Sequence, residues 1–166
     1  MPTPDFVDQL LARWAVMRPD VDLAPLRVTG RLARVGQHLA NREDLVFAEF
    51  GLNRGEVGVL AALRSAGPPH RLSPGRIGRG LMLSSAGVTS RLDRLEARGL
   101  LARQPDPRDR RGVVVELTDR GLELVDAAVA ATAAHDKELL ATLSAKEARQ
   151  LEDVLRRILR ALEPME

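Results

Sequence analysis

The residue types best suited to binding chemistry gather between positions 84 and 111. Residues 71–111 hold ten Arg against four Asp or Glu, a net charge of +6 in a chain whose total is +2. Hydroxyl and guanidinium groups donate hydrogen bonds to phosphates and base edges. This concentration predicts a nucleic-acid-binding surface; the alternative is a solvated charged face. The candidate contacts are Ser84, Ser85, Thr89, Ser90, Arg94, Arg108, Arg110 and Arg111.

Two short helices are expected to carry the first of these residues. Ser73-Pro74 marks a helix start, because serine is a favoured N-cap and proline is favoured at the first helical position. Helical spacing then gives this helix an apolar side formed by Ile77, Leu81 and Met82.

The second helix is expected to begin at Ser84 or Ser85 and to run to about residue 98, before the helix stop Gly99. Spacing of i, i+4 and i+7 places three apolar residues on one buried stripe. The residues that point away from the stripe include Ser90 and Arg94. The stripe consists of Val88, Leu92 and Leu95.

A β-hairpin is predicted after this helix. A short strand covers residues 100–103, and the segment QPDPRDRRG at residues 104–112 is rich in turn formers. Val113, Val115 and Leu117 then alternate as a half-buried strand. Helix, turn, helix and hairpin in this order predict a winged helix-turn-helix in a mainly α-helical fold, with the second helix in the DNA major groove.

The flanking segments are expected to be helical as well. Apolar residues recur at helical spacing over residues 5–17, 23–49 and 53–65, and Gly30 and Gly36 in the second of these could permit close helix approach. After Thr118 come a helix of about 23 residues and the capping box Ser144-x-x-Glu147. We therefore expect N-terminal helices for dimerisation and effector binding at residues 1–66, a DNA-binding domain at 67–118 and dimerisation helices at 119–166.

The last helix presents an apolar face that is too large for one small winged helix to cover. Such terminal helices are expected to intertwine with a second copy, which would place two recognition helices about one DNA turn apart. The alternative is an intramolecular helix bundle. The face consists of Leu151, Val154, Leu155, Ile158, Leu159 and Leu162.

Composition excludes several classes of site. The chain has no cysteine, and His38, His70 and His135 are too far apart for a typical zinc site. No apolar run approaches the length of a membrane span, which favours a cytoplasmic protein. A glycine-rich phosphate loop and a nucleophile–base pair are also missing from the sequence, so neither an enzyme nor a cofactor is expected.

The chain resembles the MarR-type (multiple-antibiotic-resistance) regulators over nearly its full length. The resemblance implies a dimeric, ligand-responsive winged-helix repressor, with Ser85, Thr89, Ser90 and Arg94 facing the major groove. It also places Arg110 and Arg111 in the wing, and we expect Asp109 to orient the wing arginines by ion pairing. The motifs are Ser84-Ser85-x-x-Val88-Thr89-x-Arg91-Leu92-x-Arg94-Leu95-Glu96-x-x-Gly99-Leu100, Asp109-Arg110-Arg111 and Leu117-Thr118-x-x-Gly121.

The extra first helix with Trp14 is similar to that of the PecS/TamR-like branch, whose members sense small anions such as urate or tricarboxylates. The resemblance implies an effector site at Trp14, Arg91 and Arg103. The branch's aspartate position falls at Gly58, although Glu56 lies two residues away, which argues against urate.

The residues themselves leave other roles open for two members of this site. Arg91 lies about 60° from Val88 around the helix, at the border of the apolar stripe. There a guanidinium could hold a carboxylate bidentately, bind phosphate or form a structural salt bridge. For Trp14, packing in the core or in a dimer interface is favoured over stacking on a ligand.

Two functions therefore remain after enzymes are set aside. The first is a transcriptional regulator, a repressor that binds pseudo-palindromic duplex DNA as a homodimer and is released by a small organic anion. The second is a constitutive architectural or accessory DNA-binding dimer without an effector. Titration of the DNA complex with small organic acids separates them, because an effector releases only the first.

Overall fold

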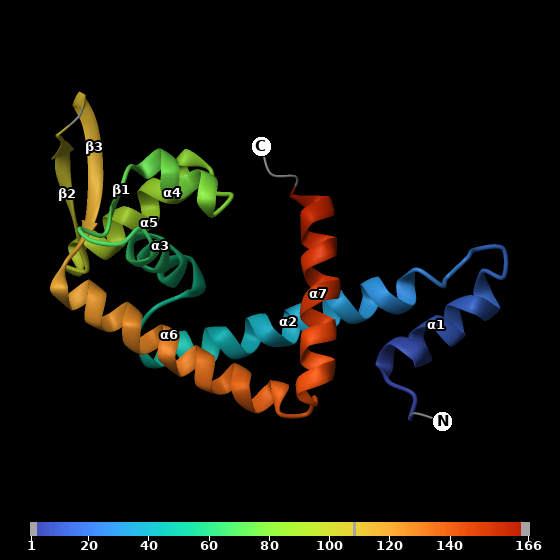
Figure 1. The fold of residues 1–166 in the computed structure, drawn as a ribbon. Helices are drawn as coiled ribbons and strands as arrows, with labels where there is room; N and C mark the ends of the chain where they lie inside the picture. Colours follow the sequence, from blue (N-terminus) through green and yellow to red (C-terminus); the bar gives the residue numbers. More distant parts are fainter. Residues whose placement is uncertain (1–2, 108, 164–166) are drawn as a thin grey trace. The chain divides into compact units, whose positions relative to one another are not determined.

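The computed structural model describes residues 3–107 and 109–163 of the chain. The chain divides into two compact units, residues 1–54 and residues 55–166. The first unit contains helices α1 (Phe6–Met17) and α2 (Leu26–Glu49). Helix α3 (Arg54–Ser65) begins at the last residue of the first unit and otherwise belongs to the second. The second unit also contains β1 (Arg71–Leu72), α4 (Pro74–Gly80), α5 (Ser85–Ala97), β2 (Leu101–Asp106), β3 (Asp109–Leu117), α6 (Asp119–Leu140) and α7 (Ala145–Leu162) (Figure 1).

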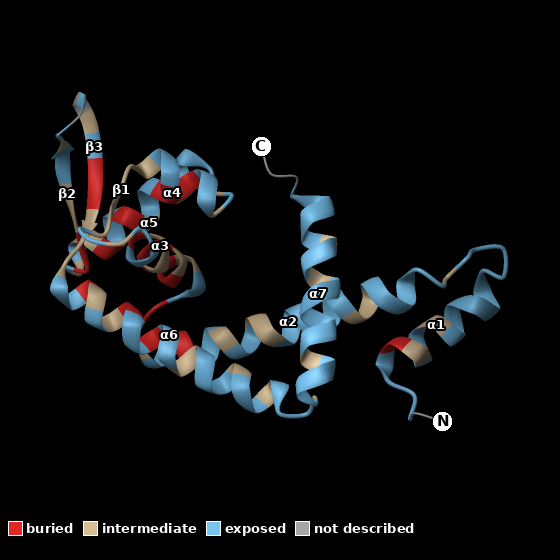
Figure 2. Ribbon diagram, viewed as in Figure 1, coloured by how far each residue is buried: buried red, intermediate tan, exposed pale blue. Residues whose placement is uncertain are grey.

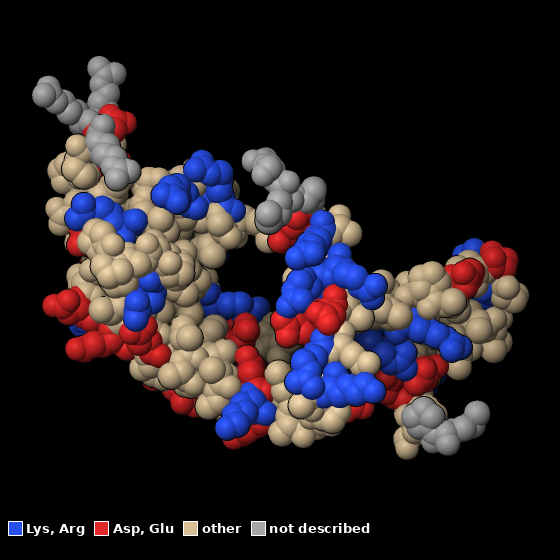
Figure 3. Space-filling model, in the orientation of Figure 1, with Lys and Arg blue, Asp and Glu red and all other residues tan. Residues whose placement is uncertain are grey.

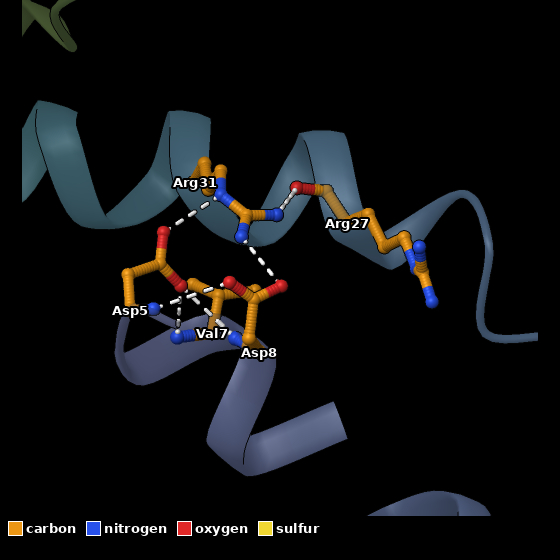
Figure 4. Close-up of polar contacts among 5 residues, drawn as sticks. All are labelled: Asp5, Val7, Asp8, Arg27 and Arg31. Carbon is orange, nitrogen blue, oxygen red and sulfur yellow. Dashed lines mark hydrogen bonds and ion pairs between the residues drawn. The ribbon is translucent and has the colours of Figure 1, made fainter. Parts of the chain in front are cut away.

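The start of α1 is fixed to α2 by one arginine. Asp5 caps α1 in a capping box with Asp8, and Arg31 of α2 donates to Asp5 over 2.8 Å and lies 2.7 Å from Asp8 (Figure 4). The Asp8 backbone N–H and Arg31 lower the pKa of Asp5, and a hydrogen bond from Arg31 is the main cause that lowers the pKa of Asp8. Gly30 faces Val7 at this contact, and an added Cβ would stand at an ordinary van der Waals distance of 3.4 Å from it.

An apolar groove of about 760 Å³ runs between α1 and α2. Trp14 lies in it with half of its surface exposed, as do Phe6 and Leu10. Arg34 borders the groove, and its guanidinium carbon lies 4.0 Å from the centroid of the Phe6 ring, in cation–π geometry. The α1 and α2 helices therefore leave an unfilled hydrophobic surface between them.

The second unit is a winged helix built on a small antiparallel sheet with strand order β1-β3-β2. Strands β2 and β3 pair from Leu101 opposite Leu117 to Pro105 opposite Val113, and an irregularity follows between Pro105 and Asp106. The turn is shorter than the predicted residues 104–112, because part of this segment pairs as strand. Pairing continues past Pro105 because β2 is an edge strand, where the missing N–H of proline costs little.

Two further sequence predictions in this unit were wrong in detail. Met82 does not lie on the apolar side of the first helix: α4 ends at Gly80, and Met82 follows in the left-handed region (φ 51°) with 84% of its surface exposed. Val113 is exposed at 44%, because it lies nearer the wing tip than Val115, which is fully buried. The two-residue strand β1 was not predicted, because it is too short to give an alternating pattern in the sequence.

The core of the second unit gathers where α3, α4, α5, the base of the wing and the start of α6 meet (Figure 2). The predicted stripe on α5 is confirmed, with Val88, Leu92 and Leu95 each at most 3% exposed. Arg64 of α3 donates to Asp126 of α6 over 2.8 Å and lowers the pKa of that carboxylate. Helix α5 thus packs its apolar stripe into this core.

The predicted helices are otherwise confirmed within a few residues. Ser73 and Ser84 cap α4 and α5, and Ser144 and Glu147 form the capping box of α7. In contrast to α5, helix α7 has no buried residue along its whole length (Figure 2). None of the helices in the described ranges is long and apolar enough to cross a membrane.

Candidate nucleic-acid interface

Helix α5 presents small and hydroxyl side chains opposite its buried stripe. The Ser84 hydroxyl accepts from the Gly87 N–H over 3.2 Å, so it serves as the N-cap, and the Thr89 hydroxyl donates to the Ser85 carbonyl over 3.0 Å. Ser85, Thr89 and Ser90 are all exposed. Such short side chains let a helix approach a duplex closely, and the backbone N–H groups at its N-terminus favour phosphate.

Arg94 extends this face and is 53% exposed. Its Nη1 donates to the Ser90 hydroxyl over 3.1 Å, and its Nε donates to Glu56 of α3 over 3.2 Å. The guanidinium is therefore held at two points, by Ser90 of its own helix and by Glu56 of α3.

Sequence reasoning did not assign Glu56 a partner on α5. The side chain is 6% exposed, and its second oxygen lies 3.6 Å from Arg98 Nη1. One signal of its burial was present in the sequence: Glu56 precedes Val57 and stands at helical spacing from Val59 and Leu60, which are also buried. Periodicity shows that such a residue points inward, but it does not show which side chains it meets.

Arg91 lies on the inner border of α5, as predicted. Its Nη1 donates to the Gly87 carbonyl over 2.9 Å, whereas its Nε is buried without a hydrogen-bond partner among the described residues. The guanidinium fills the space beside Gly55, where an added Cβ would stand 2.4 Å from Nε. Gly58, at the branch's aspartate position, instead borders Leu81, with 3.5 Å to the nearest carbon for an added Cβ.

Arg103 connects the first wing strand to the recognition helix. Its guanidinium donates to Asp93 over 2.6 Å and also bonds to Glu96, both on α5. Burial lowers the pKa of Arg103, but its bonds to the two carboxylates outweigh burial and raise that pKa. In this conformation the charge of Arg103 is already balanced.

The remaining predicted site residues lie at the wing tip and in the first unit. Asp109 begins β3 opposite Asp106. Arg108 lies outside the described residues, as do the side chains of Arg110 and Arg111, so their contacts stay predictions. Trp14 belongs to the unit of residues 1–54, whereas Arg91, Arg94 and Arg103 belong to the unit of residues 55–166.

Basic side chains also cover the first helix of the pair. Figure 3 shows Lys and Arg over α4, where Arg76 and Arg79 are both exposed. A positively charged helix beside the recognition helix suits the phosphate backbone, which supplies most of the sequence-independent affinity for DNA. The positive charge and the small-residue face therefore belong to one structural unit.

Known proteins share this arrangement. The model of the MarR family matches residues 50–112. The HTH-type transcriptional regulator PecS of Dickeya dadantii is 37% identical over 152 residues, which cover 92% of each chain. The multiple antibiotic resistance protein MarR of Salmonella typhimurium is 33% identical over 102 residues, 61% of this chain and 69% of that protein.

Solved structures agree with the sequence relatives. Sco5413, a MarR family transcriptional regulator from Streptomyces coelicolor, has a TM-score of 0.72 and 28% identity, covering 85% of this chain and 96% of that one. A MarR mutant from E. coli, solved in complex with operator DNA, has a TM-score of 0.70 and 28% identity, and the match covers 82% of this chain and 95% of that one. The chain therefore belongs to the MarR family of DNA-binding transcriptional regulators, a family of regulators rather than enzymes, and within it to the PecS-like branch.

Proposed function

We propose that this regulator is a cytoplasmic repressor that binds a pseudo-palindromic operator as a homodimer and is released by a small organic anion. The observation that carries the proposal is the exposed face of α5, with Ser85, Thr89, Ser90 and Arg94 set over a buried stripe in a winged helix. This face would read bases in the major groove, while Ser84 caps the helix.

The wing would add affinity that depends little on sequence. Arg108, Arg110 and Arg111 would contact phosphate or the minor groove, and Asp109 would orient them by ion pairing. Exposed Arg76 and Arg79 on α4 would add phosphate contacts of the same kind.

Unpartnered apolar surface supports the homodimer. Leu151, Val154, Leu159 and Leu162 of α7 are 41–73% exposed, and the groove between α1 and α2 is likewise open. Monomeric proteins rarely leave contiguous apolar patches of this kind in water. A second copy of the chain would cover both surfaces and bring two α5 helices to successive major grooves.

Leu159→Glu is expected to convert the dimer into monomers at micromolar concentration, because it places a charge within the apolar stripe of α7. Light scattering after gel filtration should give twice the 18.1 kDa chain mass for the native protein and the single mass for the variant. Arg157→Glu, on the opposite face of α7, is the matched control and should remain dimeric. A native protein of single mass would contradict the proposed dimer.

Arg91 supplies the strongest support for the anionic effector. A buried polar group without a hydrogen bond costs about 1–3 kcal/mol, and a carboxylate or purine anion placed against Arg91 would satisfy its Nε. Arg103 would join such a site only by exchanging Asp93 or Glu96 for the anion. Because both carboxylates lie on α5, the exchange would loosen the recognition helix.

Gly55→Ala is expected to weaken effector release while sparing operator binding. The added methyl would displace the Arg91 guanidinium, the mobile end of a long side chain, without removing its charge. In gel shifts titrated with citrate and with urate, we expect half-maximal release to need about tenfold more anion, equivalent to about 1.4 kcal/mol. Gly36→Ala is the control, since a methyl there meets nothing within 4 Å.

The same titration separates the two candidate functions. If the native complex responds to no anion in a panel of small carboxylates and purines, the effector-free accessory DNA-binding dimer replaces the repressor. If release is saturable but equal in the native protein and in Gly55→Ala, the effector binds elsewhere and the Arg91 site is wrong.

A further inference from the structure

Glu56 is the buried charged residue of the core among the residues that the structure describes. It lies in the first turn of α3 and is 6% exposed as a side chain. Taking a carboxylate out of water is unfavourable unless cations and hydrogen bonds compensate it. The partners of Glu56 therefore show what its burial achieves.

Two of those partners are arginines one turn apart, Arg94 on α5 and Arg98 at the C-cap of that helix. Oε1 accepts from Arg94 Nε over 3.2 Å, and Oε2 lies 3.6 Å from Arg98 Nη1. Residues four apart lie on the same side of a helix. One carboxylate thus connects α3 to the last turn of α5 and to its C-cap residue, which restrains both the rotation of α5 about its axis and its position along that axis.

The contact also orders the guanidinium of Arg94. A carboxylate at Nε and the Ser90 hydroxyl at Nη1 hold opposite parts of one planar group. Although the Arg94 side chain is 53% exposed, these two hydrogen bonds hold the plane of its guanidinium in the absence of DNA. A planar fork that is ordered in advance loses less conformational entropy when it forms two hydrogen bonds to a base.

We propose that Glu56 is a specificity-determining positioning residue: it holds Arg94 by Nε and α5 by Arg98, and so sets how the recognition helix reads operator bases. The inference rests on the proposed reading of bases by Arg94. Glu56 itself touches no base, because it is buried beneath α5. Its contribution would therefore appear in discrimination between sequences and not in the strength of phosphate binding.

The test compares Glu56→Gln with the native dimer on two duplexes of equal length, an operator selected by the native protein from random DNA and a scrambled duplex. We expect the ratio of the two affinities to fall about tenfold. The dependence of affinity on salt should keep its slope, because phosphate contacts are unchanged. Glu123→Gln, an exposed carboxylate of α6, is the charge-matched control and should keep the native ratio.

Glu56→Asp distinguishes positioning from folding. Aspartate keeps the charge but has a side chain one methylene shorter. We therefore expect a ratio of operator to scrambled affinity between those of the native protein and Glu56→Gln, with a native circular-dichroism spectrum and melting curve. Equal loss on both duplexes, equal gain on both duplexes, or an unchanged ratio in Glu56→Gln would each overturn the proposal. An equal gain would mean that Glu56 only competes with phosphate for Arg94.

A double mutant separates this inference from the function on which it rests. Glu56→Gln should lower discrimination less in an Arg94→Ala background than in the native protein, because only the contact of Glu56 with Arg98 is then left to lose. If Arg94→Ala alone leaves discrimination intact, base reading by Arg94 fails. If Arg94→Ala lowers discrimination but Glu56→Gln does not, only the positioning role of Glu56 fails.

Discussion

Replacing Arg94 by alanine is expected to weaken operator binding by about 1–3 kcal/mol, a loss of roughly 5- to 150-fold, and to relax the base preference at the positions it reads. Arg94 is a long donor on α5 that is 53% exposed, and its Nη1 donates to the Ser90 hydroxyl. Competition gel shifts or fluorescence anisotropy with single-base operator variants would measure the loss position by position.

Arg94→Lys is the informative companion. Lysine keeps the positive charge and can still pair with Glu56, but it lacks the planar fork needed for bidentate contact with a base. We expect it to retain affinity for scrambled DNA and to lose most of the preference for the operator. Equal losses on operator and scrambled duplex in Arg94→Ala would show that Arg94 contacts phosphate alone.

Gly121→Ala is expected to cost the largest amount of folding stability, about 3 kcal/mol. Gly121 lies in the first turn of α6, where an added Cβ would stand 1.9 Å from the Leu100 carbonyl oxygen and 2.9 Å from its carbon. Both atoms belong to the backbone, so they cannot move aside as a side chain could. Thermal unfolding should shift down by about 6–12 °C.

The close approach has a local cause. The Thr118 hydroxyl donates to the Gly99 carbonyl over 2.8 Å and accepts from the Gly121 N–H over 3.1 Å, which draws α6 against the base of the wing. Gly80→Ala is the control, because a methyl there meets nothing within 4 Å and should change stability by less than about 0.5 kcal/mol. A native melting temperature for Gly121→Ala would mean that the contact relaxes readily.

Local signals in the sequence determined most of the fold. The caps at Ser73, Ser84 and Ser144 depend on neighbours three residues away, and the stripe on α5 depends on helical period alone. These are properties of a short segment, so the helices and the winged-helix order could be predicted without tertiary contacts. The exposed face of α5 could be predicted in the same way, because it lies opposite the buried stripe.

Predictions were wrong where the bounds of an element depend on contacts with other parts of the chain. The extent of the hairpin depends on pairing across the two strands, which carried β2 past Pro105. Strand β1 exists because β3 offers a free edge to Arg71 and Leu72. Met82 was placed on a helix by its spacing, although the chain had already turned at Leu81.

The pairing of charges was decided by the tertiary structure alone. Helical period predicts that Arg94 points away from the buried stripe of α5, but its partner Glu56 lies 38 residues away in the chain, and only the tertiary structure brings the two to 3.2 Å. The same holds for Arg91 in the space left by Gly55. A period fixes the direction of a side chain within its own element, whereas its partner depends on which element packs against that face.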